Sequence, residues 1–317
     1  MRLDLVFAAR LVAVSAAIAA LASCGGGGGA GGPAAPVPTV SLTASNAQNV
    51  AGDVLLASVQ TPRRNGLFLP ADAQGSAPPR TQVLSRFVAD EIARLAQLNP
   101  SRSALAASSV SCTSGGITVV SDATSISETF NACASGGITI NGSITISGFT
   151  STPSSFSASV SVDLTFSAAG FADQRFTGNF TVSESGIGSN LITITISGMD
   201  LVLTQGSSIE HLANFTFSTT IDISTSGAVD SVSFAFSSAG IGGTVLVTTL
   251  TPFETSPGKQ FPHTGAIQIV GVNGSTIRVT VNGDETGPTP QVTIQVDADG
   301  NGVFETTLNK NWSDLTV

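Results

Sequence analysis

The residues best suited to chemistry lie close to the end of the chain, where residues 297–302 read Asp-Ala-Asp-Gly-Asn-Gly. Asp297, Asp299 and Asn301 offer oxygen donors at positions 1, 3 and 5, the spacing that wraps a loop around Ca²⁺. Position 12, where an EF-hand has a bidentate glutamate, is a leucine, so Glu305 is the acid left to complete such a shell. A tight turn between two strands requires the same residue types without a metal. The sequence is therefore consistent with two interpretations of this loop, a calcium site and a structural turn without metal.

The chain has two histidines, His211 and His263, and neither has the surroundings of a catalytic base. His211 follows Glu210 and lies near Ser207 and Ser208, but serine is so frequent here that one lies near any residue. No Gly-x-Ser-x-Gly elbow, His-Glu-x-x-His pair or phosphate loop occurs, which are the local patterns that would assign a reaction. We therefore expect no enzymatic activity.

Residues 1–23 have the features of a secretory signal peptide. Two arginines accompany an apolar run from Leu11 to Ala22, which is shorter than the ~20 apolar residues of a membrane span. Residues 21–24 read Leu-Ala-Ser-Cys, which resembles the bacterial lipobox, where a diacylglycerol is attached to the cysteine thiol before cleavage. We expect Cys24 to become the lipidated amino terminus. In lipoproteins with such a lipobox, an aspartate after the cysteine favours retention in the inner membrane. Because Gly25 takes that position here, the resemblance implies sorting to the outer membrane, facing either the periplasm or the exterior.

With Cys24 assigned to lipid, Cys112 and Cys133 remain as a pair in an oxidising compartment. The midpoint between them falls at Asp122-Ala123, which can form a turn. A hairpin folded there places the two cysteines opposite each other on neighbouring strands, at a separation that a disulfide accepts. We predict this disulfide, which would stabilise the fold by roughly 3 kcal/mol. The alternative is two free, buried thiols.

These residues must be positioned by the long segment 108–317, in which apolar residues alternate with Ser and Thr. Strands that alternate in this way belong to an antiparallel sheet buried on one face. Asn-Gly pairs at 141–142, 273–274 and 282–283 predict two-residue hairpin turns. On the order of a dozen strands are expected, and an open, twisted sheet of that size usually curls, splits or closes. We predict an all-β antiparallel meander that forms a curled sheet, a sandwich or a half-barrel. A transmembrane barrel is disfavoured, because the chain has no tyrosine and one tryptophan for the aromatic girdles.

Two segments precede this β region. Residues 24–60 begin with glycines and prolines and predict a flexible tether. Residues 61–107 predict a helical segment, in which apolar residues recur at three- and four-residue steps between Thr81 and Leu98 with charged residues between them. This amphipathic helix, ended by Asn99-Pro100, would cover an apolar face of the sheet. The alternative is that its arginines bind an anionic membrane surface.

The balance of charge limits the partners. The chain has 21 acidic and 12 basic residues and a net charge of −9, which argues against nucleic acid, because phosphate binding requires clustered Lys and Arg. We expect a membrane, bound through the amino-terminal lipid, and in addition an apolar ligand or another envelope protein. The sequence sets no oligomeric state.

Several stretches carry a resemblance to a known group. They are Thr129–Cys133, Asn141–Ser143, Gly265–Gly271, Ser275–Val279, Asp297–Gly302 and Trp312–Leu315. Together they resemble uncharacterised proteobacterial β-rich lipoproteins, and the resemblance implies class and location but no catalytic residue. We therefore predict a lipid-anchored cell-envelope lipoprotein with a non-enzymatic binding or structural role. The alternatives are a carrier of lipid or another apolar ligand, and a calcium-dependent surface adhesin.

Overall fold

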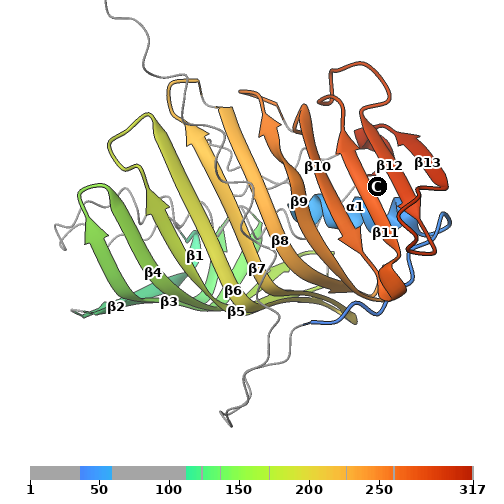
Figure 1. Cartoon of the computed structure of the whole chain (residues 1–317). Helices are drawn as coiled ribbons and strands as arrows, with labels where there is room; N and C mark the ends of the chain where they lie inside the picture. Colours follow the sequence, from blue (N-terminus) through green and yellow to red (C-terminus); the bar gives the residue numbers. More distant parts are fainter. Residues whose placement is uncertain are drawn as a thin grey trace, which may run out of the picture. The chain divides into compact units, whose positions relative to one another are not determined.

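The strands of the molecule form one open antiparallel sheet. The computed structural model describes residues 36–58 and 112–315, apart from single residues at 123, 136, 171, 226 and 260. Within these residues, 13 strands pair in the same order as they follow one another in the chain (Figure 1). β1 and β13 are the two edges of the sheet and do not pair with each other. The predicted antiparallel meander is confirmed, as one continuous sheet that does not close.

The strands are β1 (Ser114–Ser121), β2 (Ser125–Ser135), β3 (Ile138–Thr152), β4 (Ser155–Ala168), β5 (Gln174–Ser185), β6 (Leu191–Gln205), β7 (Ser208–Asp222), β8 (Gly227–Ser238), β9 (Gly243–Thr255), β10 (Thr264–Val270), β11 (Thr276–Val281), β12 (Val292–Asp297) and β13 (Thr306–Lys310). The described helices are α1 (Ala47–Ser58) and two single turns of 3₁₀-helix, η2 (Val272–Gly274) and η3 (Trp312–Asp314).

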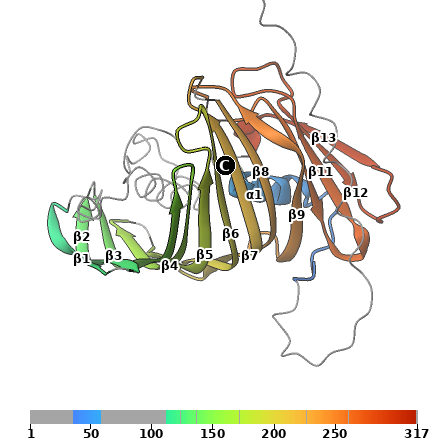
Figure 2. The ribbon, with the colours of Figure 1, turned by 60° about the vertical axis from the view of Figure 1, so that its left-hand side comes forward.

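The sheet curls, and helix α1 lies within the curve beside the carboxyl-terminal strands (Figures 1 and 2). Residues of α1 come close to β11 and β12. We call the face of the sheet that α1 covers the inner face. Because successive side chains along a strand point to opposite faces of the sheet, every second residue points to the inner face. The strand register aligns these residues in rows across the sheet.

One such row shows how the core under α1 is built. Ile267 pairs with Val279, which pairs with Ile294, which pairs with Leu308 on β13. The first three side chains are completely buried, and Leu308 packs against them at the edge. β-branched side chains suit this half-buried pleated surface, so the alternation in the sequence translates directly into a continuous apolar layer.

Helix α1 lies inside the range that we expected to be a flexible tether, residues 24–60, and this part of the prediction is wrong. The helix presents one apolar side to the sheet, formed by Ala47, Val50, Ala51, Val54 and Leu55, each at most 2% exposed. These residues follow the i, i+3, i+4, i+7 spacing of an amphipathic helix. This spacing can be read from the sequence, but the glycines and prolines before it favour a tether, and the tether was predicted for the whole range.

The chain is already attached to the sheet before the helix begins. The Thr39 amide donates to the Thr244 carbonyl at 2.9 Å, and the amide of the fully buried Leu42 donates to Ser275 Oγ at 3.1 Å. Any tether therefore ends before Thr39. The amphipathic helix predicted between Thr81 and Leu98, and the rest of segment 61–107, lie outside the described residues.

The Asn-Gly pair at 141–142 does not form the predicted turn but lies within β3. Asn141 Oδ1 accepts a hydrogen bond from the Ala132 amide at 2.8 Å, where the β2–β3 register shifts between Phe130 and Cys133. Gly142 has φ +112°, and a Cβ there would lie 2.0 Å from the Asp163 carbonyl oxygen. The pair therefore accommodates a bulge and a close strand contact instead of a hairpin.

The other two Asn-Gly pairs do lie between strands, but in longer connections than predicted. Asn273 and Gly274 both have positive φ and belong to η2, between β10 and β11. Asn282 and Gly283 follow the end of β11 and open the loop that reaches β12 at Val292. Both pairs lie in the connection between two strands, although neither makes a two-residue turn.

The predicted disulfide is confirmed. Cys112 and Cys133 are bonded, with their Cα atoms 5.1 Å apart. The hairpin of β1 and β2 turns at Asp122, as the spacing indicated, and Asp122 Oδ1 accepts the amides of Thr124 and Ser125, each at 2.7 Å. These hydrogen bonds lower the pKa of Asp122 to about 2, so the carboxylate is ionised over the whole neutral range.

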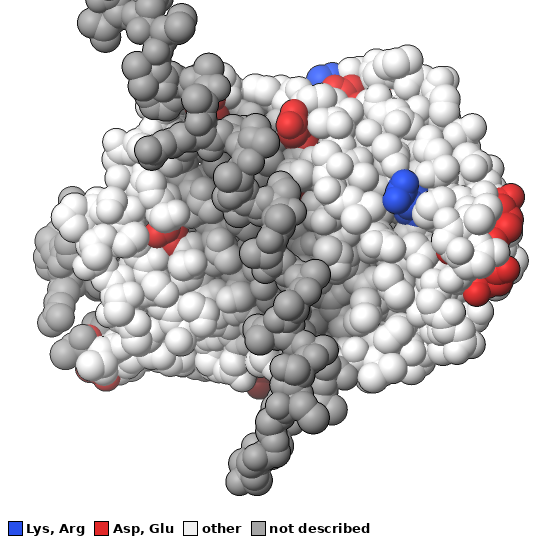
Figure 3. All heavy atoms as spheres, viewed as in Figure 1, with Lys and Arg blue, Asp and Glu red and all other residues white. Residues whose placement is uncertain are grey.

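Charged side chains are sparse on the face of the molecule shown in Figure 3, and the basic ones stand apart from one another. Among the helices of the described residues, none has both the length and the apolar character that crossing a bilayer requires.

Candidate functional site

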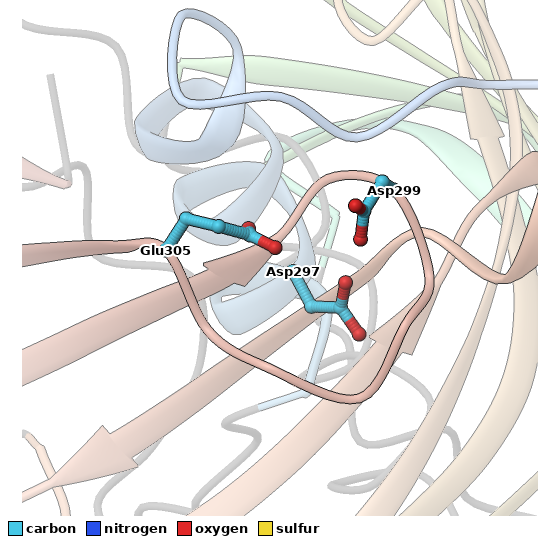
Figure 4. Close-up of side chains that lie close together, drawn as sticks. All are labelled: Asp297, Asp299 and Glu305. Carbon is cyan, nitrogen blue, oxygen red and sulfur yellow. The ribbon is translucent and has the colours of Figure 1, made fainter.

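The structure brings together three of the four residues predicted to bind calcium. Asp297 ends β12, and the loop that follows returns to β13 (Figure 4). Carboxylate oxygens of Asp297, Asp299 and Glu305 lie within 4.8 Å of one another. Asp297 is buried at 3% exposure, whereas the other two acids are exposed. The loop therefore has the charge and the oxygen donors that a hard cation prefers.

The loop also satisfies these oxygens by itself. Asp297 Oδ1 accepts the Gly300 amide and Oδ2 accepts the Gly302 amide, both at 2.8 Å. Glu305 Oε2 accepts the Ala298 amide at 3.1 Å, which closes the base of the loop. Backbone donors that converge on an aspartate in this way define an Asx-type turn. The structural turn thus accounts for the buried acid without an ion.

The fourth predicted ligand, Asn301, is committed to the same local network. Its Oδ1 accepts the Val303 amide at 2.7 Å, and its amide nitrogen donates to Asp299 Oδ2 at 2.9 Å. Gly300 has φ +74°, and a Cβ there would lie 2.6 Å from the Asn273 carbonyl oxygen. The loop therefore packs against the turn between β10 and β11, which explains why glycine is required. Calcium binding stays a prediction.

The two histidines lie far from this loop in the sequence and contact acids of their own. His211 Nε2 forms a short contact with Asp200 Oδ1 across β6 and β7. This pair is solvent-exposed, with 39% of the His211 side chain and 65% of the Asp200 side chain accessible. It is a surface pair of the kind that contributes little to stability.

His263 belongs to a group that sequence reasoning did not identify. Its Nδ1 lies 3.2 Å from Ser256 Oγ, and its Nε2 lies 3.7 Å from Glu254 Oε2. Serine, histidine and acid are the parts of a hydrolase triad, but the His263 and Glu254 side chains are 42% and 55% exposed. Catalysis by such a group is strongest where fixed donors meet the oxyanion in a site shielded from bulk solvent. The group is better described as a polar cluster where β9 leads into β10.

A second feature missed from the sequence is a row of the inner face that contains carboxylates. In this row Glu184 on β5 pairs with Ile194, Ile194 with Thr219, and Thr219 with Asp230 on β8. Phe156 and Phe253 bound the row on β4 and β9. The alternation could have revealed it, because Glu184 follows Phe180 and Val182 at every second position, and Asp230 precedes Val232 and Phe234 in the same way.

Both carboxylates are held in an environment that disfavours their charge. Asp230 is 3% exposed and accepts one hydrogen bond, from Thr219 Oγ1 at 2.6 Å. Burial raises the pKa of Asp230 to about 7, and burial also raises the pKa of Glu184. Asp230 Oδ2, Glu184 Oε2 and Thr255 Oγ1 are buried without a hydrogen-bond partner. Buried polar atoms are normally paired, and among the described residues two of the unpaired buried oxygens, those of Glu184 and Asp230, lie in this row.

Cys24, the predicted lipidation site, lies outside the described residues. No family model, no curated protein and no solved structure matches this chain. The resemblance to β-rich lipoproteins therefore stays a prediction, as does the assignment of an outer-membrane location.

Proposed function

We propose that this chain is a lipid-anchored lipoprotein of the bacterial cell envelope with a non-enzymatic binding or structural role. The observation that carries the proposal is how the three cysteines divide. Cys112 and Cys133 are joined in a disulfide, a bond that persists in exported proteins and is rare in the cytosol. This leaves Cys24, at the end of the apolar run, as the one thiol available for lipid.

The attachment of the chain to the sheet agrees with such an anchor. Residues from Thr39 onward are tied to β9 and to the turn before β11, so at most the stretch from Cys24 to about residue 38 separates a lipid from the folded part. If flexible, this stretch would extend on average about 20–25 Å, enough to place the sheet just outside the headgroups.

The test compares two cysteine variants in cells. Cys24→Ser is expected to lose incorporation of labelled fatty acid and to leave the membrane fraction. Cys112→Ser, the matched control, removes the disulfide but is expected to keep both the label and the membrane association. Membrane association of Cys24→Ser at the level of wild type would refute the lipid anchor.

A second candidate function, carriage of a lipid or another apolar ligand, is favoured by the carboxylate row. The row combines an apolar surface with polar atoms that lack partners in the fold, a combination typical of sites that orient a mostly apolar ligand. Mass spectrometry of lipid extracted from the purified chain should then find a defined species at a constant ratio to protein. Extracts that contain no such species would rule out this second function.

A further inference from the structure

The two edges of the sheet differ in how they are protected. β13 is short and ends in Lys310, and the buried Trp312 lies two residues further on. β1 is longer and reads Ser-Gly-Gly-Ile-Thr-Val-Val-Ser, with no charged residue and no proline. Natural sheets usually protect an edge with lysine, proline or a very short strand, because an edge presents unpaired N–H and C=O groups. β1 lacks these protections.

The β1 edge is also held in place. The disulfide joins Cys112, just before the strand, to Cys133 on β2, and pairing with β2 continues from Gly116 to Ser121. Thr118 is exposed and Val120 is 64% exposed. Among the described residues no strand pairs with the edge of β1 that faces away from β2. β1 lies at the end of the sheet in Figure 2. A fixed strand edge that pairs with no further strand among the described residues is a template for β-augmentation.

We propose that β1 pairs antiparallel with β1 of a second copy of this chain, so that two sheets join across a twofold axis. An antiparallel pair of identical strands is self-complementary, as a twofold interface requires. The absence of charge in β1 favours its own copy as partner, because no like charges meet across the axis. Pairing of β13 with itself would instead bring two copies of Lys310 into one short interface.

The alternation of β1 limits the registers that this pair can adopt. Opposed residues must lie on the same face of the joined sheet, and the regular part of the strand begins at Gly116. A twofold axis at Thr118 satisfies both conditions. It places Ile117 opposite Val119 of the second copy on the inner face, where Ile117 already packs against the core. The apolar inner face then continues from one copy into the other.

The register is tested by cross-linking of the full chain in membranes. Thr118→Cys places two thiols across the axis, so it should give a covalent dimer on a non-reducing gel. Wild type and Thr307→Cys, an exposed position on the opposite edge strand, should give none. A covalent dimer in Thr307→Cys, or its absence in Thr118→Cys, would overturn the proposal.

The interface is tested independently by sedimentation of the full lipidated chain in detergent. Wild type and Thr307→Lys are expected to be dimers, and Thr118→Lys a monomer, because it places two ammonium groups in direct opposition. A monomeric wild type would mean that β1 takes a strand from another protein or none, and a dimeric Thr118→Lys would mean that a different surface associates. Either result would refute pairing of β1 with β1 of a second copy.

Discussion

The part of the sheet under α1 and the central part of the sheet treat buried polar groups in opposite ways. Under α1, on β10–β13, the buried polar side chains lie at strand ends and are paired. Asp297 accepts backbone amides, and Gln291 Oε1 accepts the Trp312 amide at 3.1 Å. In the centre, on β5–β8, Glu184 and Asp230 lie within the apolar row, and each has an oxygen without a partner.

This difference teaches that one alternating pattern can produce two kinds of surface. An apolar row whose polar groups are all paired at its ends forms a core, and close packing of its side chains stabilises the fold. An apolar row with unpaired carboxylates loses stability through desolvation. The central region is therefore where the fold gives up stability, and stability is commonly lost where a protein binds something.

The largest expected effect concerns the packed core under α1. Ile294→Ala removes a completely buried side chain beneath α1 and should lower the free energy of unfolding by about 2–5 kcal/mol. Chemical denaturation measures this. Gln295→Ala, the next residue on the other face of β12, should change it by less than about 0.5 kcal/mol. Equal losses in the two variants would contradict the assignment of the inner face.

The next effect concerns the pH dependence of stability that Asp230 produces in the carboxylate row. The pKa of Asp230 is about 7 in the folded state and ~3.9 in the unfolded state. Between these two pH values the folded state therefore binds a proton that the unfolded state does not. Its contribution to stability is complete below pH ~3.9 and is lost as pH rises to about 7, with a slope of at most about 1.4 kcal/mol per pH unit. Asp230→Asn should flatten this decline, as measured by thermal unfolding across pH.

Asp222 is the matched control for that experiment. Hydrogen bonds from the Ser224 hydroxyl and amide lower the pKa of Asp222, so its contribution has the opposite sign and is lost as pH falls. Asp222→Asn should therefore leave the decline toward pH 7 in place. If Asp222→Asn flattened the decline and Asp230→Asn did not, the account of the carboxylate row would be wrong.

A smaller effect concerns Asp297, the buried acid at the end of β12. Asp297→Ala removes the acceptor of the Gly300 and Gly302 amides and should cost about 1–3 kcal/mol. Because the turn satisfies itself, the cost should be the same in calcium and in a chelator. A calcium-dependent rise in melting temperature that is present in wild type and absent in Asp297→Ala would instead establish the predicted metal site.

The smallest effect concerns Trp312, which stacks on Phe261 with ring centroids 4.5 Å apart and donates its indole N–H to the Gly283 carbonyl at 2.9 Å. Trp312→Phe keeps an aromatic ring but leaves that carbonyl unpaired. We expect a loss of about 1 kcal/mol in the free energy of unfolding. No measurable loss would contradict a stabilising role for this hydrogen bond.

The sequence predicted most of the fold, because period-2 alternation directly determines which residues face the core. It predicted the disulfide as well, since a hairpin centred at Asp122 sets the positions of Cys112 and Cys133. It could not predict that Asn141-Gly142 accommodates a bulge, because that role depends on the neighbouring strands β2 and β4. Helix α1 was missed because composition outweighed a short helical pattern. The carboxylate row was readable, but only by following the phase of alternation through Glu184 and Asp230.

The central claim, a lipid-anchored envelope protein with an oxidised β domain, is tested most directly by mass spectrometry. The chain is extracted from membranes, digested without reduction and analysed as peptides. The account predicts an amino-terminal peptide that begins with an acylated, diacylglycerol-modified Cys24, together with a disulfide-linked pair of peptides containing Cys112 and Cys133. An amino-terminal peptide that begins at Met1, or one that carries an unmodified Cys24, would contradict it.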